Sequence, residues 1–145
     1  MNLMMLLEMA ASGLADRIAV GSRDGGLTYA ALFDRAGATA RRLRSNEVDA
    51  AVLCDESSRA VPLTLFGAAW AGVPYVPLNY RLPEDDLLAL AGRVGTALAV
   101  TDETNLSRLA AVDDVSTVLR DTFLADPSDG TDAGAAPGDL SLIHI

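Results

Sequence analysis

Short, continuous apolar runs alternate along this chain with longer stretches in which apolar residues recur every three or four positions. The run 49–55 is apolar inside and charged at both ends, and 97–101 and 116–119 are two further short runs. Runs of this length are typical of strands that are covered on both faces of a parallel sheet. We therefore predict three buried strands at these positions.

The stretches between these runs have helical spacing and recognisable helix ends. Thr28 is suited to cap a helix, because its side-chain oxygen can accept a backbone N–H of the first turn. Gly72 is suited to end one, since glycine adopts the left-handed conformation at low cost. Acidic residues 84–86 follow Pro83 at the start of another, where the helix dipole favours negative charge. The predicted helices span 3–14, 28–44, 59–71, 83–91 and 105–111.

Two further segments predict less regular strands. The strand expected at 73–78 contains Pro74 and Pro77, each of which removes a donor, so we expect it at a sheet edge or with an irregular end. Residues 17–22 predict a strand that a turn at 23–26 folds back as a hairpin. Because strands and helices alternate with short links, the fold class is α/β: a doubly wound, mostly parallel sheet flanked by helices.

The apolar patterning stops near residue 125. Hydrophobic residues make up 50% of the 145-residue chain, so we expect 1–124 to form one domain with its own core. From 125 to 139 Asp, Gly, Ala, Pro and Ser predominate, which predicts a flexible acidic linker. We interpret the apolar residues 140–145 as a truncated strand or a non-native tail.

The charge balance excludes several classes of partner. The chain has 20 acidic and 11 basic residues, a net charge of −9, and every basic residue is an arginine. Such a surface repels nucleic-acid phosphates and anionic membranes, so we predict no nucleic-acid partner. The only arginine cluster, Arg41, Arg42 and Arg44, is short and fits a solvated helix face.

Membrane and redox features indicate a cytoplasmic protein. The uncharged stretch 60–78 approaches the length of a membrane span, but three prolines and Gly72 divide it into a helix and a strand. The first residues lack a positive region and contain Glu8, unlike a signal peptide. Cys54 is the only cysteine and lies in an apolar run, where we expect a buried thiol and no disulfide.

Two segments carry a resemblance to a known family. They read Leu27-Thr28-Tyr29-Ala30-Ala31-Leu32 and, within the run 65–82, Ala71-Gly72-Val73-Pro74-Tyr75-Val76-Pro77-Leu78-Asn79-Tyr80-Arg81-Leu82. In order and separation they resemble the amino-terminal signature of the AMP-forming acyl-CoA synthetases, which are adenylate-forming enzymes. The resemblance covers most of the chain and implies the amino-terminal subdomain of the synthetase fold, incomplete.

The resemblance also implies a reaction. Members of this family join a carboxylic acid to ATP with the help of Mg, giving an acyl-adenylate and pyrophosphate, and then form a thioester with CoA. The run 77–82, with Asn79 after Leu78, is similar to the corresponding run in acyl-CoA and aryl-CoA synthetases. Peptide-synthetase adenylation domains usually have Asp-Pro after this leucine. The implied function is therefore that of a carboxylate–CoA ligase, of the kind used in fatty acid metabolism.

The groups that would carry out this chemistry are not found in the sequence. Adenylation needs a loop rich in Gly, Ser and Thr to hold the phosphates, and a lysine to stabilise the transition state. The family's phosphate loop begins just beyond a strand that resembles 139–143, and the chain has no lysine. We therefore expect an amino-terminal fragment that is inactive alone and has no catalytic residue; His144, the only histidine, has no partner for acid–base work.

Three residues are candidates for binding CoA in the intact enzyme. In the family, the segment after the second strand and an arginine after the following strand lie near the CoA nucleotide. These places hold Tyr80, Arg81 and Arg108. Tyr80 would stack on adenine and the arginines would bind the 3′-phosphate, although ordinary surface roles also fit these residues.

Two other interpretations stay open on the sequence alone. One is a non-catalytic α/β module such as a receiver, because Asp55-Glu56 imitates part of a receiver's acidic pattern, although the receiver's lysine is missing. The other is a peptide-synthetase adenylation domain, which transfers its substrate to a carrier-protein thiol.

Overall fold

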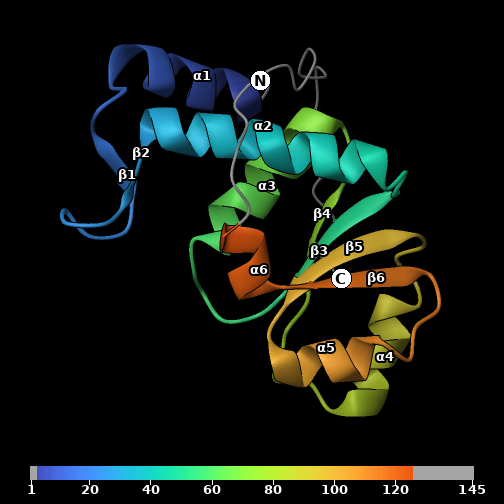
Figure 1. The fold of residues 1–145 in the computed structure, drawn as a ribbon. Helices are drawn as coiled ribbons and strands as arrows, with labels where there is room; N and C mark the ends of the chain where they lie inside the picture. The colour runs from blue at the N-terminus through green and yellow to red at the C-terminus, as the bar shows by residue number, and fades with distance from the viewer. Residues whose placement is uncertain (1–2, 126–145) are drawn as a thin grey trace.

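A four-stranded parallel sheet between two layers of helices organises residues 3–125, the part of the chain that the computed structural model describes (Figure 1). A two-stranded antiparallel hairpin lies beside the helices. In chain order the elements are α1 (Leu3–Gly13), β1 (Ile18–Val20), β2 (Leu27–Thr28), α2 (Tyr29–Ser45), β3 (Ala50–Cys54), α3 (Ala60–Ala71), β4 (Tyr75–Pro77), α4 (Glu84–Ala91), β5 (Ala97–Thr101), α5 (Glu103–Leu109), β6 (Val115–Leu119) and α6 (Arg120–Ala125).

The strands of the larger sheet follow the order β4-β3-β5-β6, and all three pairings are parallel. The two central strands, β3 and β5, are buried along their whole length because helices cover both faces. This confirms the predicted doubly wound parallel sheet. β4 lies at one edge of the described sheet, with Pro77 opposite Leu53, as its prolines predict.

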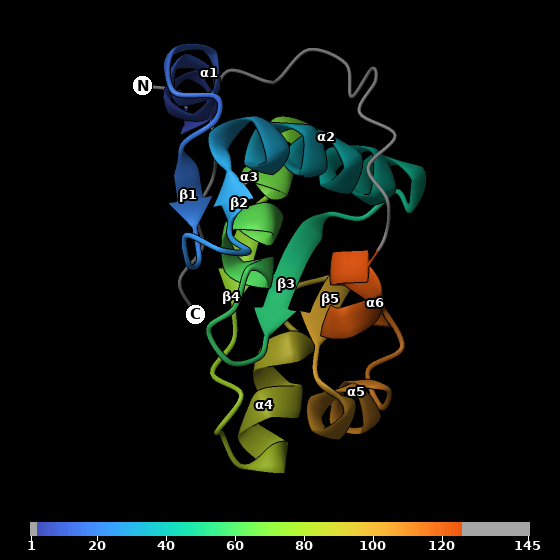
Figure 2. The ribbon, with the colours of Figure 1, turned by 60° about the vertical axis from the view of Figure 1, so that its left-hand side comes forward.

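Each central strand contributes alternate side chains to two separate cores. Ala51 and Leu53 belong to a cluster that includes residues of α1, α2, α3 and α6. Val52 and Cys54 belong to a second cluster, built with α4 and α5. The two helix layers lie on opposite faces of the sheet (Figure 2). The uninterrupted apolar runs in the sequence are therefore a direct consequence of burial on both sides.

The two longest helices, α2 and α3, pack against each other over the sheet. Gly67 permits this close approach, because a Cβ at this position would lie 2.3 Å from Cγ2 of Thr39. The rings of Phe33 and Trp70 meet across the same pair of helices, with centroids 4.7 Å apart. Trp70 is half-buried and packs against the core.

Helix ends lie close to the predicted positions. The Thr28 side chain caps α2 by accepting the Ala31 N–H at 3.1 Å. Gly72 ends α3 with a φ of 79°, the left-handed conformation that glycine adopts most easily. Asp85 and Asp86 lie in the first turn of α4, where the dipole favours them. Within residues 3–125 no helix combines the length and the apolar character needed to cross a membrane.

The structure differs from the sequence predictions in the bounds of one helix and in the presence of another. The helix expected at 105–111 begins at Glu103, because Asp102 is its N-cap and accepts the Asn105 N–H at 2.7 Å. The sequence pattern does not predict α6, which is too short to show a helical period; burial of Phe123 holds it against the core. Ala125, where the expected linker begins, is the last residue of α6, and residues 126–145 lie outside the described part of the chain.

Candidate functional site

The carboxyl ends of the parallel strands are where this topology favours a binding site. From β3 the chain passes to β4 on one side, and then to β5 on the other side of β3. The loops that follow β3 and β5 therefore diverge. In open α/β sheets, ligands bind in the crevice outside the strand ends at such a switch point.

The segment after β4 holds Tyr80 and Arg81, and Asn79 shapes it. The Asn79 side chain accepts the Arg81 N–H at 3.0 Å, and its carbonyl accepts the Leu82 N–H at 3.1 Å. Arg81 Nε donates to the Tyr80 hydroxyl at 3.1 Å, and its guanidinium carbon lies 5.3 Å from the ring centroid. Arg81 is exposed, whereas Tyr80 is half-buried. One face of the tyrosine ring therefore already carries a cation.

Arg108 reaches the same segment from α5. Its Nη1 donates to the Tyr80 carbonyl at 3.3 Å, and its Nη2 donates to the Leu82 carbonyl. Nη1 also donates to the side-chain oxygen of Asn105 at 2.9 Å. The guanidinium group thus contacts the residues on either side of Arg81.

The structure therefore brings together the three residues that the sequence nominates for the CoA nucleotide. Two guanidinium groups lie around one short loop, in a chain of net charge −9. Planar guanidinium groups bind phosphates through paired hydrogen bonds, so this surface suits an anionic ligand. The ring of Tyr80 packs against the core, and the Arg81 guanidinium lies over it. An adenine can therefore stack on the Arg81 guanidinium, but it can reach the Tyr80 ring only if Arg81 moves.

A second polar pair lies at the carboxyl ends of the strands, where Asp55 follows β3 and Arg120 follows β6. No sequence pattern predicts this pair. Arg120 Nη1 donates to Asp55 Oδ1 at 3.0 Å, although 65 residues separate them. The Asp55 side chain has no exposed surface, and its Oδ2 has no hydrogen-bond partner. Burial raises the pKa of Asp55 above its usual 3.8, against the opposite effects of the Glu56 N–H and Arg120. The only sequence feature that could have indicated this pair is the position of Asp55 directly after a fully apolar strand.

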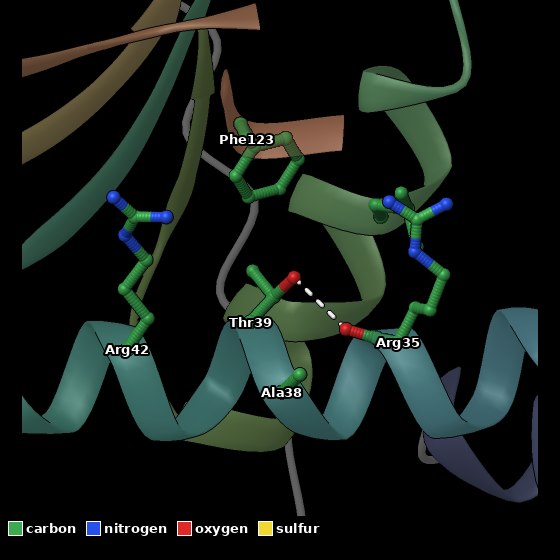
Figure 3. Close-up of a pocket in the computed structure, with 6 residues that line it drawn as sticks. Arg35, Ala38, Thr39, Arg42 and Phe123 are labelled. Atoms are coloured by element: carbon green, nitrogen blue, oxygen red, sulfur yellow. Dashed lines mark hydrogen bonds between the residues drawn. The ribbon is translucent and has the colours of Figure 1, made fainter. Parts of the chain in front are cut away.

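Two cavities of the described residues do not suit a nucleotide. A cavity of about 300 Å³ lies beside Arg120, but three carboxylates share its lining and disfavour a phosphate; it is lined by Thr101, Asp102, Glu103, Thr104, Leu119, Arg120 and Asp121. A second cavity, of about 20 Å³, lies between Arg35, Arg42 and Phe123 (Figure 3). It has room for about one water molecule.

The other reactive groups of residues 3–125 include a single thiol, that of Cys54. Burial raises the pKa of the Cys54 thiol to about 11, so this thiol, which is buried as predicted, is not a nucleophile at neutral pH. No group of three or more His, Cys, Asp or Glu side chains in this part of the chain is arranged to hold a metal ion. His144 lies outside the described residues.

Related curated proteins include both peptide synthetases and CoA ligases. N-(5-amino-5-carboxypentanoyl)-L-cysteinyl-D-valine synthase of Amycolatopsis lactamdurans is 34% identical over 111 residues, which are 72% of this chain and 3% of that protein. 4-Hydroxybutyrate–CoA ligase 2 of Metallosphaera sedula is 30% identical over 115 residues, which are 77% of this chain and 21% of that protein. The chain therefore spans only a small part of the relatives that it matches.

The fold and the family follow from two further matches. A benzoate CoA ligase from Burkholderia xenovorans LB400 has the same fold, with a TM-score of 0.79 at 19% identity, over 96% of this chain and 30% of that one. The family model described as AMP-binding enzyme matches residues 7–140. A receiver-like module is thereby ruled out, and the chain belongs to the AMP-binding family of adenylate-forming enzymes.

Proposed function

We propose that this chain is the amino-terminal part of an ATP-dependent, AMP-forming carboxylate–CoA ligase. In this proposal residues 1–124 supply scaffold and a surface for the CoA nucleotide, 125–139 form a linker, and the adenylation chemistry belongs to residues that this sequence does not contain. The observation that supports it is that Arg108 binds the loop after β4 on both sides of Arg81, so that two arginines lie at one short loop. A cytoplasmic location is part of the same proposal.

The 3′-phosphate of CoA is the chemical group that fits this surface. Arg81 is exposed, and its two terminal nitrogens make no hydrogen bond to any of residues 3–125. These nitrogens can donate in parallel to two phosphate oxygens. The Arg81 guanidinium lies over the Tyr80 ring, and Arg108 holds the same loop through the Tyr80 and Leu82 carbonyls.

Asn79 favours CoA over a carrier protein as the thiol donor. Its side-chain oxygen accepts the Arg81 N–H, a bond that an aspartate would also form. An aspartate, however, would place a negative charge beside Arg81 and oppose phosphate binding. The neutral amide keeps the same turn without that repulsion. The 34% identity to a peptide synthetase supports the second candidate, an adenylation domain that loads a carrier protein.

Titration of the purified 145-residue chain with CoA and dephospho-CoA tests the nucleotide surface. We expect dephospho-CoA to bind about tenfold more weakly, because losing the charge-assisted bonds to the 3′-phosphate costs about 1.4 kcal/mol. Arg81→Ala is expected to remove this difference, whereas Arg93→Ala, at another exposed arginine, is expected to keep it. Equal affinity for the two ligands in the unaltered chain, or no CoA binding, would contradict the proposal.

ATP–pyrophosphate exchange tests the assignment of chemistry to other residues. The purified chain is expected to show no exchange above a protein-free blank, because it contains no lysine to stabilise the charge of the transition state. Exchange that increases in proportion to the concentration of this chain would show that it carries out adenylation itself.

A further inference from the structure

A continuous series of hydrogen bonds links the end of β5 to the loop after β4. It begins at Asp102, whose Oδ1 accepts both the backbone N–H of Asn105, at 2.7 Å, and its side-chain Nδ2, at 3.0 Å. Asn105 is only 2% exposed, so water cannot replace these bonds. A buried asparagine in this position has one satisfactory amide orientation, with nitrogen toward the carboxylate and oxygen away from it.

The orientation of Asn105 determines where Arg108 can lie. The outward-facing oxygen of Asn105 accepts a hydrogen bond from Arg108 Nη1 at 2.9 Å. The same guanidinium group donates to the carbonyls of Tyr80 and Leu82, which flank Arg81. Only the fork geometry of an arginine reaches all three acceptors, since a lysine offers a single point of charge.

The donors of the two candidate arginines are used differently. Arg108 is half-buried, and its terminal nitrogens form three hydrogen bonds within the protein. Arg81 is exposed, and of its side-chain nitrogens only Nε forms a hydrogen bond among the described residues. A ligand at this surface therefore meets the free edge of Arg81, while Arg108 is engaged in holding the backbone on both sides of it.

We propose that Asp102, Asn105 and Arg108 act together as a positioning device for the loop 79–82. The device presents Arg81 to the nucleotide phosphate, and Arg108 is a positioning residue that does not itself bind the phosphate. This inference rests on the proposed function, because it assigns separate roles to the two arginines of the CoA surface. It adds Asp102 and Asn105 to the residues on which that surface depends.

Amide hydrogen exchange of the ligand-free chain tests the device independently of CoA. The N–H groups of Arg81 and Leu82 are both held by Asn79, so their exchange reports the order of the loop. Arg108→Lys and Asn105→Ala are each expected to speed this exchange about tenfold, with the amide of Ala99 in β5 as an unaffected internal control. Unchanged exchange at Arg81 and Leu82 in both variants would overturn the positioning role.

CoA titration of the same variants separates positioning from direct binding. If Arg108 only positions the loop, Arg108→Lys weakens CoA binding as much as Arg108→Ala does, because charge alone does not restore the three hydrogen bonds. Arg81→Lys, in contrast, keeps part of the affinity through its charge. Retention of CoA affinity by Arg108→Lys would assign direct contact to Arg108 and overturn the inference. Failure of the unaltered chain to bind CoA, with faster loop exchange in the variants, would instead reject the proposed function and leave the positioning device supported.

Discussion

Replacing Gly67 by alanine is expected to lower the free energy of unfolding by about 2 kcal/mol. The new Cβ would lie 2.3 Å from Cγ2 and 2.5 Å from Cβ of Thr39, where α2 and α3 pack together. Overpacking of this kind costs about 3 kcal/mol, against about 1 kcal/mol gained from the better helix propensity of alanine. Urea denaturation of the purified chain, followed by circular dichroism, measures the difference.

Gly13→Ala is the matched control for this experiment. Gly13 also lies in a helix, at the end of α1, but a Cβ there would meet no atom within 4 Å. The same substitution is therefore expected to leave the stability unchanged or raise it. Adding Thr39→Ser to Gly67→Ala removes the methyl group that is nearest and should restore part of the loss. Gly67→Ala with wild-type stability would show that the two helices can separate at no cost.

Replacing Arg120 by alanine is expected to destabilise the chain by about 2 kcal/mol at pH 7, since it leaves a buried carboxylate without its partner. The Asp55 side chain has no exposed surface, whereas the Arg120 side chain is 29% exposed, so we expect less than the loss from a fully buried pair. Urea denaturation between pH 3.5 and pH 7 measures the effect.

The pH dependence of the Arg120→Ala variant has a definite sign. Burial already raises the pKa of Asp55 above 3.8, and removing the nearby cation raises this pKa further. The folded state then holds the proton of Asp55 more tightly than the unfolded state does. The contribution of Asp55 to stability is therefore fully present below its unfolded-state pKa, about 4, and is lost as the pH rises through its folded-state pKa. The destabilisation by Arg120→Ala should be small at pH 3.5 and full at pH 7.

Two variants control for other effects of removing Arg120. Asp121→Ala removes the exposed partner of the same arginine, which lies 3.5 Å from Nε, and should change the stability little. Adding Asp55→Asn to Arg120→Ala removes the buried charge and should recover part of the loss at pH 7. A destabilisation that is equal at pH 3.5 and pH 7 would mean that packing by the arginine stem, and not the Asp55 charge, is responsible.

Local signals predicted most of the fold correctly. The apolar run 49–55 contains β3, which is buried along its length, and the prolines of 73–78 correctly indicated an edge strand. Thr28 and Gly72 lie at helix ends because capping depends on nearby backbone groups alone. α6 could not be predicted in this way, since a helix of 6 residues depends on tertiary contacts, here the burial of Phe123.

The candidate site was predictable only in part. The family resemblance nominates all three candidates, Tyr80, Arg81 and Arg108, for the CoA nucleotide. The sequence does not predict the hydrogen bonds of Arg108 to the loop, because they span 28 and 26 residues and depend on how α5 lies against it. The sequence pattern places Asn105 only at the start of a helix, and its neighbours along the chain do not indicate that it is buried.

The sequence by itself determined the alternation of strands and helices, the burial of the central strands and the membership in an adenylate-forming family. These properties depend on patterns that repeat over a few residues. Only the tertiary structure decided which polar groups meet: Asp55 with Arg120 across 65 residues, and Arg108 with the carbonyls around Arg81. The physical reason is that strand order, which no local pattern encodes, determines which strand ends become neighbours at the edge of the sheet.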